Sequence, residues 1–405
     1  MNPRFKTAML AAAQLTAGGN LNAATAAIQR ALAGDTATFH ETASRSAGPS
    51  WGGEVIDIDA RWLPEDMQAE SRPSGKVGAE AARAQVGLDK RARANTDAAP
   101  GRTLTGTYSA PAGSRDYILY LPAETQAPAK GRPVIVMLHG CTQTPADFAA
   151  GTAMNALADR HGFLVLYPAQ SKSANQSACW NWFNPRDQRA NAGEPAILAG
   201  MVRKVLADQG GDPAQVHVAG LSAGGAMAAI LADAYPELFA SVAVHSGLKA
   251  GAARDLPSAL SAMKRGAASD DAGTGVAGLA DSLSFDSFSF GSAKTSGKSK
   301  PVRTIVFHGR QDRTVHPLNG RQVVAEALAR FPQDELVARQ EAGRSPGGRS
   351  YTRTIHVDPH GTPMVEQWEV QGAGHAWSGG SASGSYTDPI GPDASAAMIE
   401  FFFSR

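Results

Sequence analysis

Five continuous apolar runs, each about as long as one strand, lie between residues 134 and 307. They are Val134–Leu138, Phe163–Tyr167, Val216–Ala219, Val242–Val244 and Val302–Phe307. A strand that is apolar at every position is buried on both faces, which is typical of a parallel sheet covered by helices. Leu104–Ser109 and Arg115–Leu121 alternate instead, as half-exposed strands do, and Tyr351–Val357 with Val365–Val370 resembles a late hairpin or an edge pair.

Segments with helical spacing separate most of these runs. The predicted helices are Pro145–Asp159, Glu194–Gln209, Ala223–Tyr235, Leu318–Phe331 and a final Asp393–Phe403. Strands that alternate with helices predict an α/β fold, in which a mostly parallel central sheet carries helices on both faces. In such sheets the active site lies beyond the carboxyl ends of the strands.

Two long stretches lack this pattern and set the expected domain boundaries. Residues 35–100 are polar and predict a largely irregular linker, and residues 266–300 predict a low-complexity insertion within a main domain of residues 101–405. Residues 1–34 predict a small helical hairpin. Its basic start faintly resembles a signal peptide, but Gln14 interrupts the apolar run, so we favour a helix.

Composition narrows the possible partners. The formal net charge of +1 gives no electrostatic footprint for nucleic acid or an anionic membrane surface. No apolar run reaches the length of about 18 residues that a membrane-spanning helix needs, so we expect no such helix. The two cysteines are too few for a disulfide-built fold and are wrongly spaced for a zinc site, so we expect no metal.

The sharpest chemical signal is the segment Gly220-Leu221-Ser222-Ala223-Gly224. It follows a predicted strand and opens an Ala-rich helix, which is the context of a Gly-x-Ser-x-Gly nucleophile elbow in α/β-hydrolases. Glycines fit because so tight a strand-to-helix turn leaves no room for Cβ atoms beside the serine. An incidental serine in a glycine-rich turn is the alternative. We therefore predict Ser222 as the nucleophile of a serine hydrolase.

A serine hydroxyl needs a base to take its proton, and in this fold the chain order is serine, acid, histidine. His375 stands in a glycine-containing loop just after the last predicted strand, and we expect it to be that base. His308, near a strand end, is the second candidate. His217 and His245 lie in or at the end of predicted strands, where structural histidines are usual.

The acid that orients the histidine should follow the penultimate strand. Asp312 occupies that loop, a few residues after Val302–Phe307, and we expect it to complete the triad. The alternative is a solvated surface aspartate. The aspartates of the 266–300 insertion are less suitable, because a low-complexity segment holds a side chain poorly in place.

Two backbone amides should stabilise the oxyanion of a tetrahedral intermediate. One is the amide of Ala223, directly after the nucleophile. The other is predicted to be the amide of Cys141, in the turn His139–Gln143 that follows Val134–Leu138. An ordinary strand-end turn is the alternative for this second position.

Four segments together carry a family resemblance. They are His139–Gln143, Cys179–Phe183, Gly220–Gly224 and Gly374–Trp377. This combination resembles the polyhydroxybutyrate depolymerase family of esterases, a group similar to feruloyl and acetyl-xylan esterases, over about residues 103–405. The resemblance implies an α/β-hydrolase fold, hydrolysis of carboxylic esters, the triad Ser222, Asp312 and His375, no metal and no organic cofactor.

Aromatic residues stand near these motifs. Trp180, Trp182 and Trp377 are candidates for substrate contact, because flat apolar side chains suit an acyl chain or an aromatic acyl group. The alternative is that these tryptophans pack their loops. Position favours Trp377, two residues from His375, for the substrate role.

The two cysteines are predicted to pair. Cys141 should lie at the carboxyl end of one central strand and Cys179 in the loop after a neighbouring strand, Phe163–Tyr167, which places both on the same face. The alternative is a pair of buried free thiols, as a cytoplasmic location would favour.

The favoured function is hydrolysis of a polyhydroxyalkanoate polymer or its oligomers through an acyl-enzyme. A feruloyl or acetyl-xylan type esterase is the alternative within the class, and a non-catalytic polymer-binding protein on a hydrolase scaffold is the alternative outside it. Family resemblance and the expected disulfide favour an extracellular or periplasmic location, with the cytoplasm as the alternative because the signal peptide is unclear.

Overall fold

The computed structural model describes residues 101–123, 128–268, 300–332 and 335–404. The chain divides into two units, Met1–Thr96 and Asp97–Arg405, and all of the described residues belong to the second. The predicted hairpin of residues 1–34, the linker 35–100 and most of the predicted insertion 266–300 lie outside the described residues.

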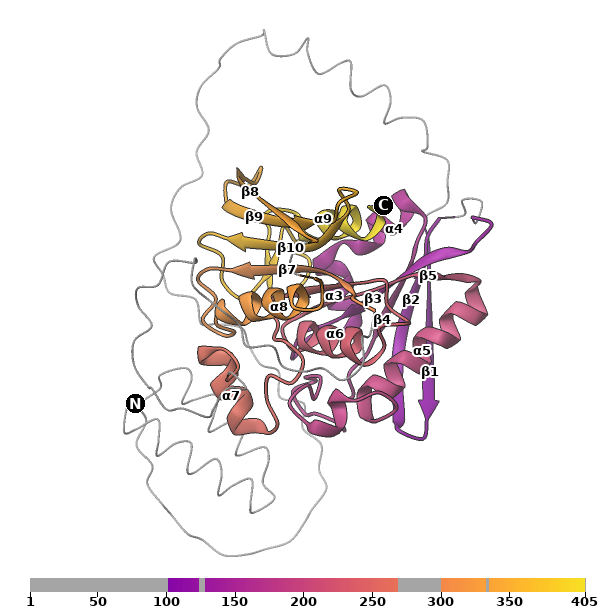
Figure 1. Ribbon diagram of the computed structural model, residues 1–405. Helices are drawn as coiled ribbons and strands as arrows, with labels where there is room; N and C mark the ends of the chain where they lie inside the picture. Colours follow the sequence, from indigo (N-terminus) through magenta and orange to yellow (C-terminus); the bar gives the residue numbers. More distant parts are fainter. Residues whose placement is uncertain (1–100, 124–127, 269–299, 333–334, 405) are drawn as a thin grey trace, which may run out of the picture. The chain divides into compact units, whose positions relative to one another are not determined.

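A ten-stranded sheet forms the centre of this unit, in the order β1-β2-β4-β3-β5-β6-β7-β10-β9-β8 (Figure 1). Its strands are β1 Arg102–Ala110, β2 Gly113–Leu121, β3 Arg132–Leu138, β4 Leu164–Pro168, β5 Gly211–Leu221, β6 Ser241–His245, β7 Arg303–Gly309, β8 Val337–Arg344, β9 Ser350–Val357 and β10 Pro363–Val370. The six neighbouring strands β4, β3, β5, β6, β7 and β10 pair in parallel. The two strands at each edge, β1 with β2 and β9 with β8, pair antiparallel with each other and with the strand next to them. The predicted mostly parallel sheet is confirmed.

Helices fill the connections between the parallel strands, and one more helix follows the last strand of the sheet, β10. They are α3 Pro145–Thr152, α4 Met154–His161, α5 Gly193–Gln209, α6 Ala223–Ala234, α7 Leu256–Arg265, α8 Leu318–Leu328 and α9 Ala394–Phe403. A short 3-10 helix, η3 Pro185–Gln188, precedes α5, and the two-residue strands β11 Trp377–Ser378 and β12 Thr387–Asp388 pair with each other after β10.

The alternation of side chains along β3 shows how the sheet is covered on both faces. Val134, Val136 and Leu138 join a core cluster with residues of α5, α6 and α8, whereas Ile135 and Met137 join a second cluster with residues of α3, α4 and α9. Successive side chains of a strand point to opposite faces, so a strand that is apolar throughout supplies both cores. The result is the expected arrangement of a sheet between two helical layers (Figure 1).

Several elements differ from the prediction. The expected helix Pro145–Asp159 is two helices, because Ala153 has left-handed backbone angles (φ 51°, ψ 24°) and ends the first one. The strand β8 and the helix α7 were not predicted. The pair Tyr351–Val357 and Val365–Val370 forms the expected antiparallel pair, but Val365–Val370 also pairs in parallel with β7 and is therefore an inner strand.

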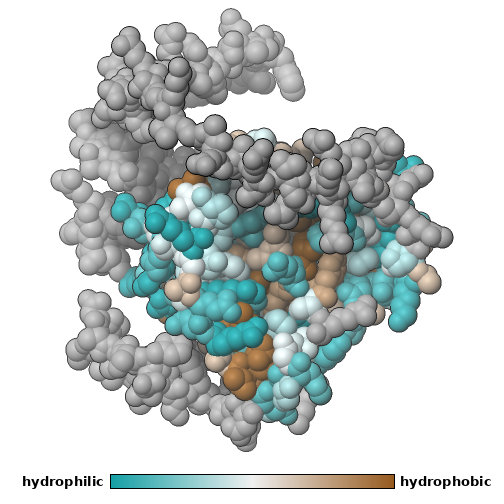
Figure 2. Space-filling model, turned by 90° about the horizontal axis from the view of Figure 1, so that it is seen from above, coloured by the Kyte–Doolittle hydropathy of each residue, from teal (hydrophilic) through white to brown (hydrophobic). Residues whose placement is uncertain are grey.

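The surface of the described unit is mixed. On the face in Figure 2, hydrophobic side chains are visible in the middle and at the lower edge among mainly hydrophilic ones. The large hydrophobic side chains that remain exposed are Leu104, Leu256, Leu318, Val337, Tyr386 and Ile390. Within the described ranges, no helix combines the length and the apolar character needed to cross a bilayer.

Candidate active site

The predicted nucleophile elbow is present between β5 and α6. Ser222 has φ 58° and ψ −119°, a strained conformation for a residue with a side chain, and α6 begins at the next residue. A Cβ built on Gly220 would lie 2.3 Å from the Gly224 backbone, and one built on Gly224 would lie 2.1 Å from the Leu138 carbonyl oxygen. Only glycine fits at these two positions, so the sequence motif is explained by close backbone approach.

Asp312 and His375 form a hydrogen-bonded pair. The His375 Nδ1 atom lies 2.7 Å from Asp312 Oδ2, and Asp312 lies in the loop after β7 with a fully buried side chain. Its other oxygen, Oδ1, accepts hydrogen bonds from the amides of Thr314 and Val315. These contacts fix the carboxylate from both sides, so it can orient the imidazole as the triad requires.

The carboxylate of Asp312 is held ionised. Burial alone would raise its pKa, but hydrogen bonds and charge interactions with His308 and His375 lower that pKa far below its ordinary value. An Asp312 that is ionised at neutral pH stabilises the imidazolium that forms when His375 takes a proton.

The loop that carries His375 is fastened over β6, beside the elbow. The Ser378 amide donates to His245 Nε2 at 3.0 Å, and the Trp377 ring stacks on the His245 ring with centroids 5.0 Å apart. The carbonyl of His245 in turn accepts from the Ser222 amide at 2.9 Å. The histidine loop and the serine are thus linked through one residue of β6, although β7 separates β6 from β10.

In this arrangement the two reactive atoms remain unengaged. Among the described residues, neither the Ser222 hydroxyl nor His375 Nε2 has a hydrogen-bond partner. The segments that carry Ser222 and His375 are linked through His245, and no hydrogen bond joins the Ser222 hydroxyl to the imidazole. In free enzymes catalytic hydrogen bonds are often long or poorly aligned, and they tighten only when substrate binds.

The competing histidines have structural partners. His308 Nε2 donates to the Val315 carbonyl at 2.8 Å and lies 3.4 Å from Asp312 Oδ2, so this ring helps to hold the aspartate. His217 stacks on Phe402 inside β5, and burial lowers its pKa to about 3. Burial also lowers the pKa of His245 to about 3, so its ring stays neutral under the Trp377 stack.

The predicted oxyanion turn lies against the elbow. A Cβ on Gly140 would be 3.6 Å from Ser222 Cβ, which places residues 140–142 beside the serine. The amide of Ala223 heads α6, where the first amides of a helix have no intrahelical partner. The structure therefore brings together both predicted donors, while their role in catalysis stays a prediction.

The predicted disulfide is confirmed. Cys141 and Cys179 are bonded, with their Cα atoms 4.2 Å apart, and this bond joins the oxyanion turn to the loop after β4. The Thr142 amide donates to the Ser177 carbonyl at 2.7 Å, which adds a second link between the same two segments.

Opening this disulfide is expected to destabilise the protein. Replacing Cys141 and Cys179 by serine releases a loop that spans 38 positions, and the chain-entropy account gives a loss of about 3–4 kcal/mol in the free energy of unfolding. Denaturant unfolding of the wild type with and without a reductant measures the loss. The double variant is the control, since a reductant should not change its midpoint. An unchanged wild-type midpoint after complete reduction would contradict the prediction.

The loop after β4 is also held by a buried carboxylate, which was not predicted from the sequence. Glu194, in the first turn of α5, accepts from the Asn181 amide and side chain, from Gln170 and from Arg115. Burial raises its pKa, and these donors offset part of that effect. An acidic residue in an otherwise apolar helix face was the available signal, because a buried charge is retained only when partners surround it.

The three tryptophans are core residues, which corrects the predicted substrate role. Trp180, Trp182 and Trp377 are only 0%, 5% and 1% exposed. Trp180 Nε1 donates to the His139 carbonyl, and Trp377 Nε1 donates to the Ser395 hydroxyl. Their indole groups pack and fasten the loops around the site, as the alternative interpretation held, and present no surface to a substrate.

Tyr386 is the exposed aromatic residue that sequence reasoning missed. It is 48% exposed, has φ 52°, and its hydroxyl lies 3.2 Å from Thr142 Oγ1 in the oxyanion turn. Its carbonyl accepts from the Trp377 amide at 2.7 Å, which ties it to the histidine loop. The positive φ of this bulky residue is strained, and the sequence gives no sign of such a backbone conformation.

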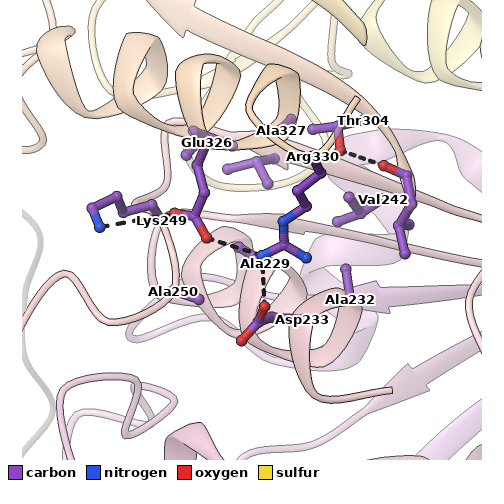
Figure 3. Close-up of a pocket in the computed structure, with 13 residues that line it drawn as sticks. Ala229, Ala232, Asp233, Val242, Lys249, Ala250, Thr304, Glu326, Ala327 and Arg330 are labelled. Atoms are coloured by element: carbon purple, nitrogen blue, oxygen red, sulfur yellow. Dashed lines mark hydrogen bonds and ion pairs between the residues drawn. The ribbon is translucent and has the colours of Figure 1, made fainter. Parts of the chain in front are cut away.

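A small cavity lies elsewhere, between α6 and α8. Its volume is about 40 Å³, and Figure 3 shows Arg330 between Glu326 and Asp233, with Lys249 on the far side of Glu326. Arg330 pairs with Asp233 at 2.6 Å and with Glu326 at 3.0 Å. Two cations balance two anions along this cavity, so its charged side chains are already paired with one another within the helix packing. In the described part of the chain, no group of three acidic, histidine or cysteine side chains is placed to bind a metal.

Solved structures support the fold. An acetyl xylan esterase from Aspergillus awamori superposes with a TM-score of 0.53 at 21% identity, over 74% of this chain and 98% of that one. At this identity the likeness concerns the fold alone.

Curated relatives are more similar in sequence. A poly(3-hydroxyalkanoate) depolymerase C of Paucimonas lemoignei is 30% identical over 274 residues, which cover 67% of this chain and 61% of the relative. A poly(3-hydroxybutyrate) depolymerase of Ralstonia pickettii is 26% identical, over 70% of this chain and 54% of its own. A feruloyl esterase B of Thermothelomyces thermophilus is 30% identical, over 60% and 78%. The chain thus spans less than two thirds of the two depolymerases.

The family assignment rests on a longer pattern than any single motif. Residues 115–330, more than half of the chain, match the family described as Esterase PHB depolymerase. The match includes β2 to α8 and therefore the oxyanion turn, the disulfide, the elbow and the Asp312 loop. The chain belongs to the PHB depolymerase family of esterases.

Proposed function

We propose that this protein hydrolyses carboxylic esters through an acyl-enzyme on Ser222. His375 takes the proton of the Ser222 hydroxyl as the oxygen attacks the ester carbonyl, and the amides of Cys141 and Ala223 receive the oxyanion. The imidazolium then protonates the leaving alcohol. Water, deprotonated by His375, attacks the acyl-enzyme and releases the carboxylic acid, which regenerates Ser222.

One observation carries this proposal. The strained Ser222 stands at the head of α6, beside the oxyanion turn, while the His375 loop is fastened over β6 with its ring held by a buried, ionised Asp312. A polymer-binding protein without catalysis would have no need to keep a serine in a strained turn or to bury a charged carboxylate against a histidine. The catalytic function therefore accounts for costly features that the non-catalytic alternative leaves unexplained.

The proposed substrate is a polyhydroxyalkanoate, as the polymer or as its oligomers. Two curated depolymerases of such polyesters align over about two thirds of this chain, and the family match points the same way. An ester of ferulic or acetic acid on a plant polysaccharide is the second candidate. It is supported by the feruloyl esterase, which has the same 30% identity and is covered over 78% of its length.

A parallel assay separates these substrates. Purified protein would be incubated with polyhydroxybutyrate film, hydroxybutyrate oligomers, methyl ferulate and acetylated xylan, and the released acid would be measured. Release of hydroxybutyrate from film or oligomers supports the proposal, and release of only ferulate or acetate favours the second candidate. A fluorophosphonate probe, which labels active serine hydrolases irrespective of substrate, tests the reaction class. A protein that is neither labelled nor active on any ester would overturn the proposed function.

The disulfide bears on where the protein works. A Cys141–Cys179 bond persists in oxidising compartments and is rare in the reducing cytoplasm. We therefore propose an extracellular or periplasmic location, where a polymeric ester substrate is also encountered. Thiol titration of denatured, unreduced protein from its natural source tests this, since two free thiols would contradict it.

Tyr386 is expected to contact the substrate in place of the buried tryptophans. Replacing it with alanine removes an exposed ring at the rim of the site, so KM for a p-nitrophenyl ester should rise about 10-fold with kcat changed little. Tyr386→Phe keeps the ring and should keep most of the affinity. Leu104→Ala, which removes another exposed apolar side chain on the edge strand β1, serves as the control. Equal KM values for the Tyr386→Ala variant and the wild type would exclude the contact.

A further inference from the structure

The oxyanion turn contains a buried histidine that the reaction does not use directly. His139 follows β3, is 1% exposed, and has hydrogen bonds at both ring nitrogens. Its Nε2 atom lies 3.1 Å from the amide of Gln170, and its Nδ1 atom lies 2.8 Å from the carbonyl oxygen of Gly140.

The partners of the ring determine its tautomer. A backbone amide can only donate, so the Gln170 amide requires Nε2 of His139 to accept. In a neutral imidazole the proton then resides on Nδ1, which donates to the Gly140 carbonyl. Burial lowers the pKa of His139, so the ring is neutral at neutral pH and keeps this arrangement.

The Gly140 carbonyl belongs to the same peptide group as the Cys141 amide. In a trans peptide the C=O and N–H bonds point in opposite directions, so holding the carbonyl sets the direction of the N–H. The Gln143 amide also donates to this carbonyl, at a longer 3.3 Å. The peptide that ends in the Cys141 amide is thus held at its oxygen from the interior of the protein.

The neighbouring amides of the turn are occupied. Gly140 donates to Gln143 Oε1 at 2.9 Å, Thr142 donates to the Ser177 carbonyl, and Gln143 donates to the Gly140 carbonyl. Of residues 140–143, Cys141 alone has an amide with no hydrogen-bond partner in the described part of the chain. Its Cα is also fixed by the disulfide, and Gly140 lies beside Ser222. The turn leaves one donor free and holds that donor next to the nucleophile.

We infer that His139 is a positioning residue, whose Nδ1–H aims the Cys141 amide at the oxyanion by holding the Gly140 carbonyl. This inference rests on the proposed function, since an oxyanion forms only if Ser222 attacks an ester. A preorganised donor acts on the transition state far more than on the bound ester. Loss of the Nδ1–H group should therefore lower kcat and leave KM nearly unchanged.

Two conservative variants separate positioning from structural support. His139→Asn places an amide nitrogen near the position of Nδ1 and keeps a donor for the Gly140 carbonyl, but it loses the acceptor for Gln170. His139→Gln places its amide near the position of Nε2, so it keeps the acceptor for Gln170 and leaves the Gly140 carbonyl with only the longer bond from the Gln143 amide. Both are neutral and polar, and the glutamine variant retains the hydrogen bond to the Gln170 amide in the loop after β4.

The test measures kcat and KM of the wild type and both variants on p-nitrophenyl butyrate, together with their melting temperatures. The glutamine variant should lose about 10²-fold in kcat at nearly constant KM, as when an oxyanion donor is removed, whereas the asparagine variant should stay within about 5-fold of the wild type. Inhibition by a trifluoromethyl ketone, which forms a tetrahedral oxyanion adduct with the serine, should weaken in the glutamine variant in proportion to kcat.

The outcomes that overturn the inference are distinct. Equal losses in both variants, or a larger loss in the asparagine variant, would show that the Gln170 contact or packing matters and that aiming of the amide does not. A glutamine variant with full kcat would exclude the role altogether. A wild type that hydrolyses no ester and takes up no fluorophosphonate would instead refute the proposed function on which the inference depends.

Discussion

Replacement of Ser222 by alanine is expected to lower kcat for p-nitrophenyl butyrate by about 10⁵- to 10⁶-fold, the loss typical of removing the nucleophile of a serine triad. The physical reason is that no other group in the elbow can form the acyl-enzyme, since Ser222 is flanked by Leu221 and Ala223. The change should not unfold the protein, because the Ser222 hydroxyl makes no hydrogen bond to another described residue. Alanine also removes only one oxygen.

The measurement pairs the rate assay with thermal unfolding. Ser109→Ala, on the edge strand β1, is the matched control: it removes one hydroxyl from an exposed position far along the sheet from β5. Wild-type rates are expected for the control and a background rate for Ser222→Ala. A Ser222→Ala protein that is folded and retains more than a tenth of the wild-type rate would exclude the acyl-enzyme mechanism.

The centre of the sheet was predictable because its strands are buried on both faces. Runs such as Val134–Leu138 leave no polar position for solvent, and this pattern fixes both the strand and its place in the centre of the sheet. The strand β8, Val337–Arg344, was missed for the opposite reason. It is an edge strand whose side chains are almost all exposed, so its sequence shows no apolar alternation. Backbone hydrogen bonds pair β8 with β9, and such bonds leave no pattern in the sequence.

Helix boundaries depended on local backbone conformations that composition does not reveal. The break between α3 and α4 occurs at Ala153, a good helix former that takes left-handed angles here. The helix α7 was missed because it is short and adjoins the low-complexity stretch, although Asp255 and Ser258 form a capping box at its start. That four-residue pattern was a readable signal for a helix N-terminus.

The candidate site divides in the same way. Ser222, Asp312 and His375 could be predicted as a triad because each has a fixed place relative to a strand end, and strand ends were visible in the sequence. The direction of a side chain is set by the packing of distant segments, which the sequence does not show. The same indole of Trp377 that suited a substrate role in the sequence stacks instead on His245 in the core. Tyr386 was not predicted as a residue of the site, because the sequence does not show the unusual backbone angles at this position.

Asp312→Asn is expected to lower kcat by about 10⁴-fold while leaving the fold in place, as the loss of the triad acid does when geometry is kept. The contacts of the aspartate decide how the new side chain is oriented. Oδ1 accepts from the amides of Thr314 and Val315, so the carboxamide oxygen of asparagine must take that position. Its NH₂ group then replaces Oδ2 and faces His375.

This orientation gives His375 the wrong tautomer. An NH₂ group can only donate, so Nδ1 of the imidazole becomes an acceptor and the proton moves to Nε2, the atom that should take the proton of Ser222. Asp312→Ala is the comparison, because it removes the carboxylate without offering a donor to Nδ1. If the wrong tautomer is the main cause, the asparagine variant should be at least as slow as the alanine variant.

The pH dependence of the wild type supplies an independent check on the same carboxylate. Since its pKa lies far below the ordinary value of 3.8, Asp312 stays ionised as the pH falls through 4, and the stability that its ionisation contributes is present at neutral pH and is lost only at more acidic pH. Unfolding experiments should therefore show the wild type losing its stability advantage over Asp312→Asn below about pH 4. An advantage that disappeared between pH 5 and 7 would mean that the carboxylate is not held by His308 and His375 as the structure shows.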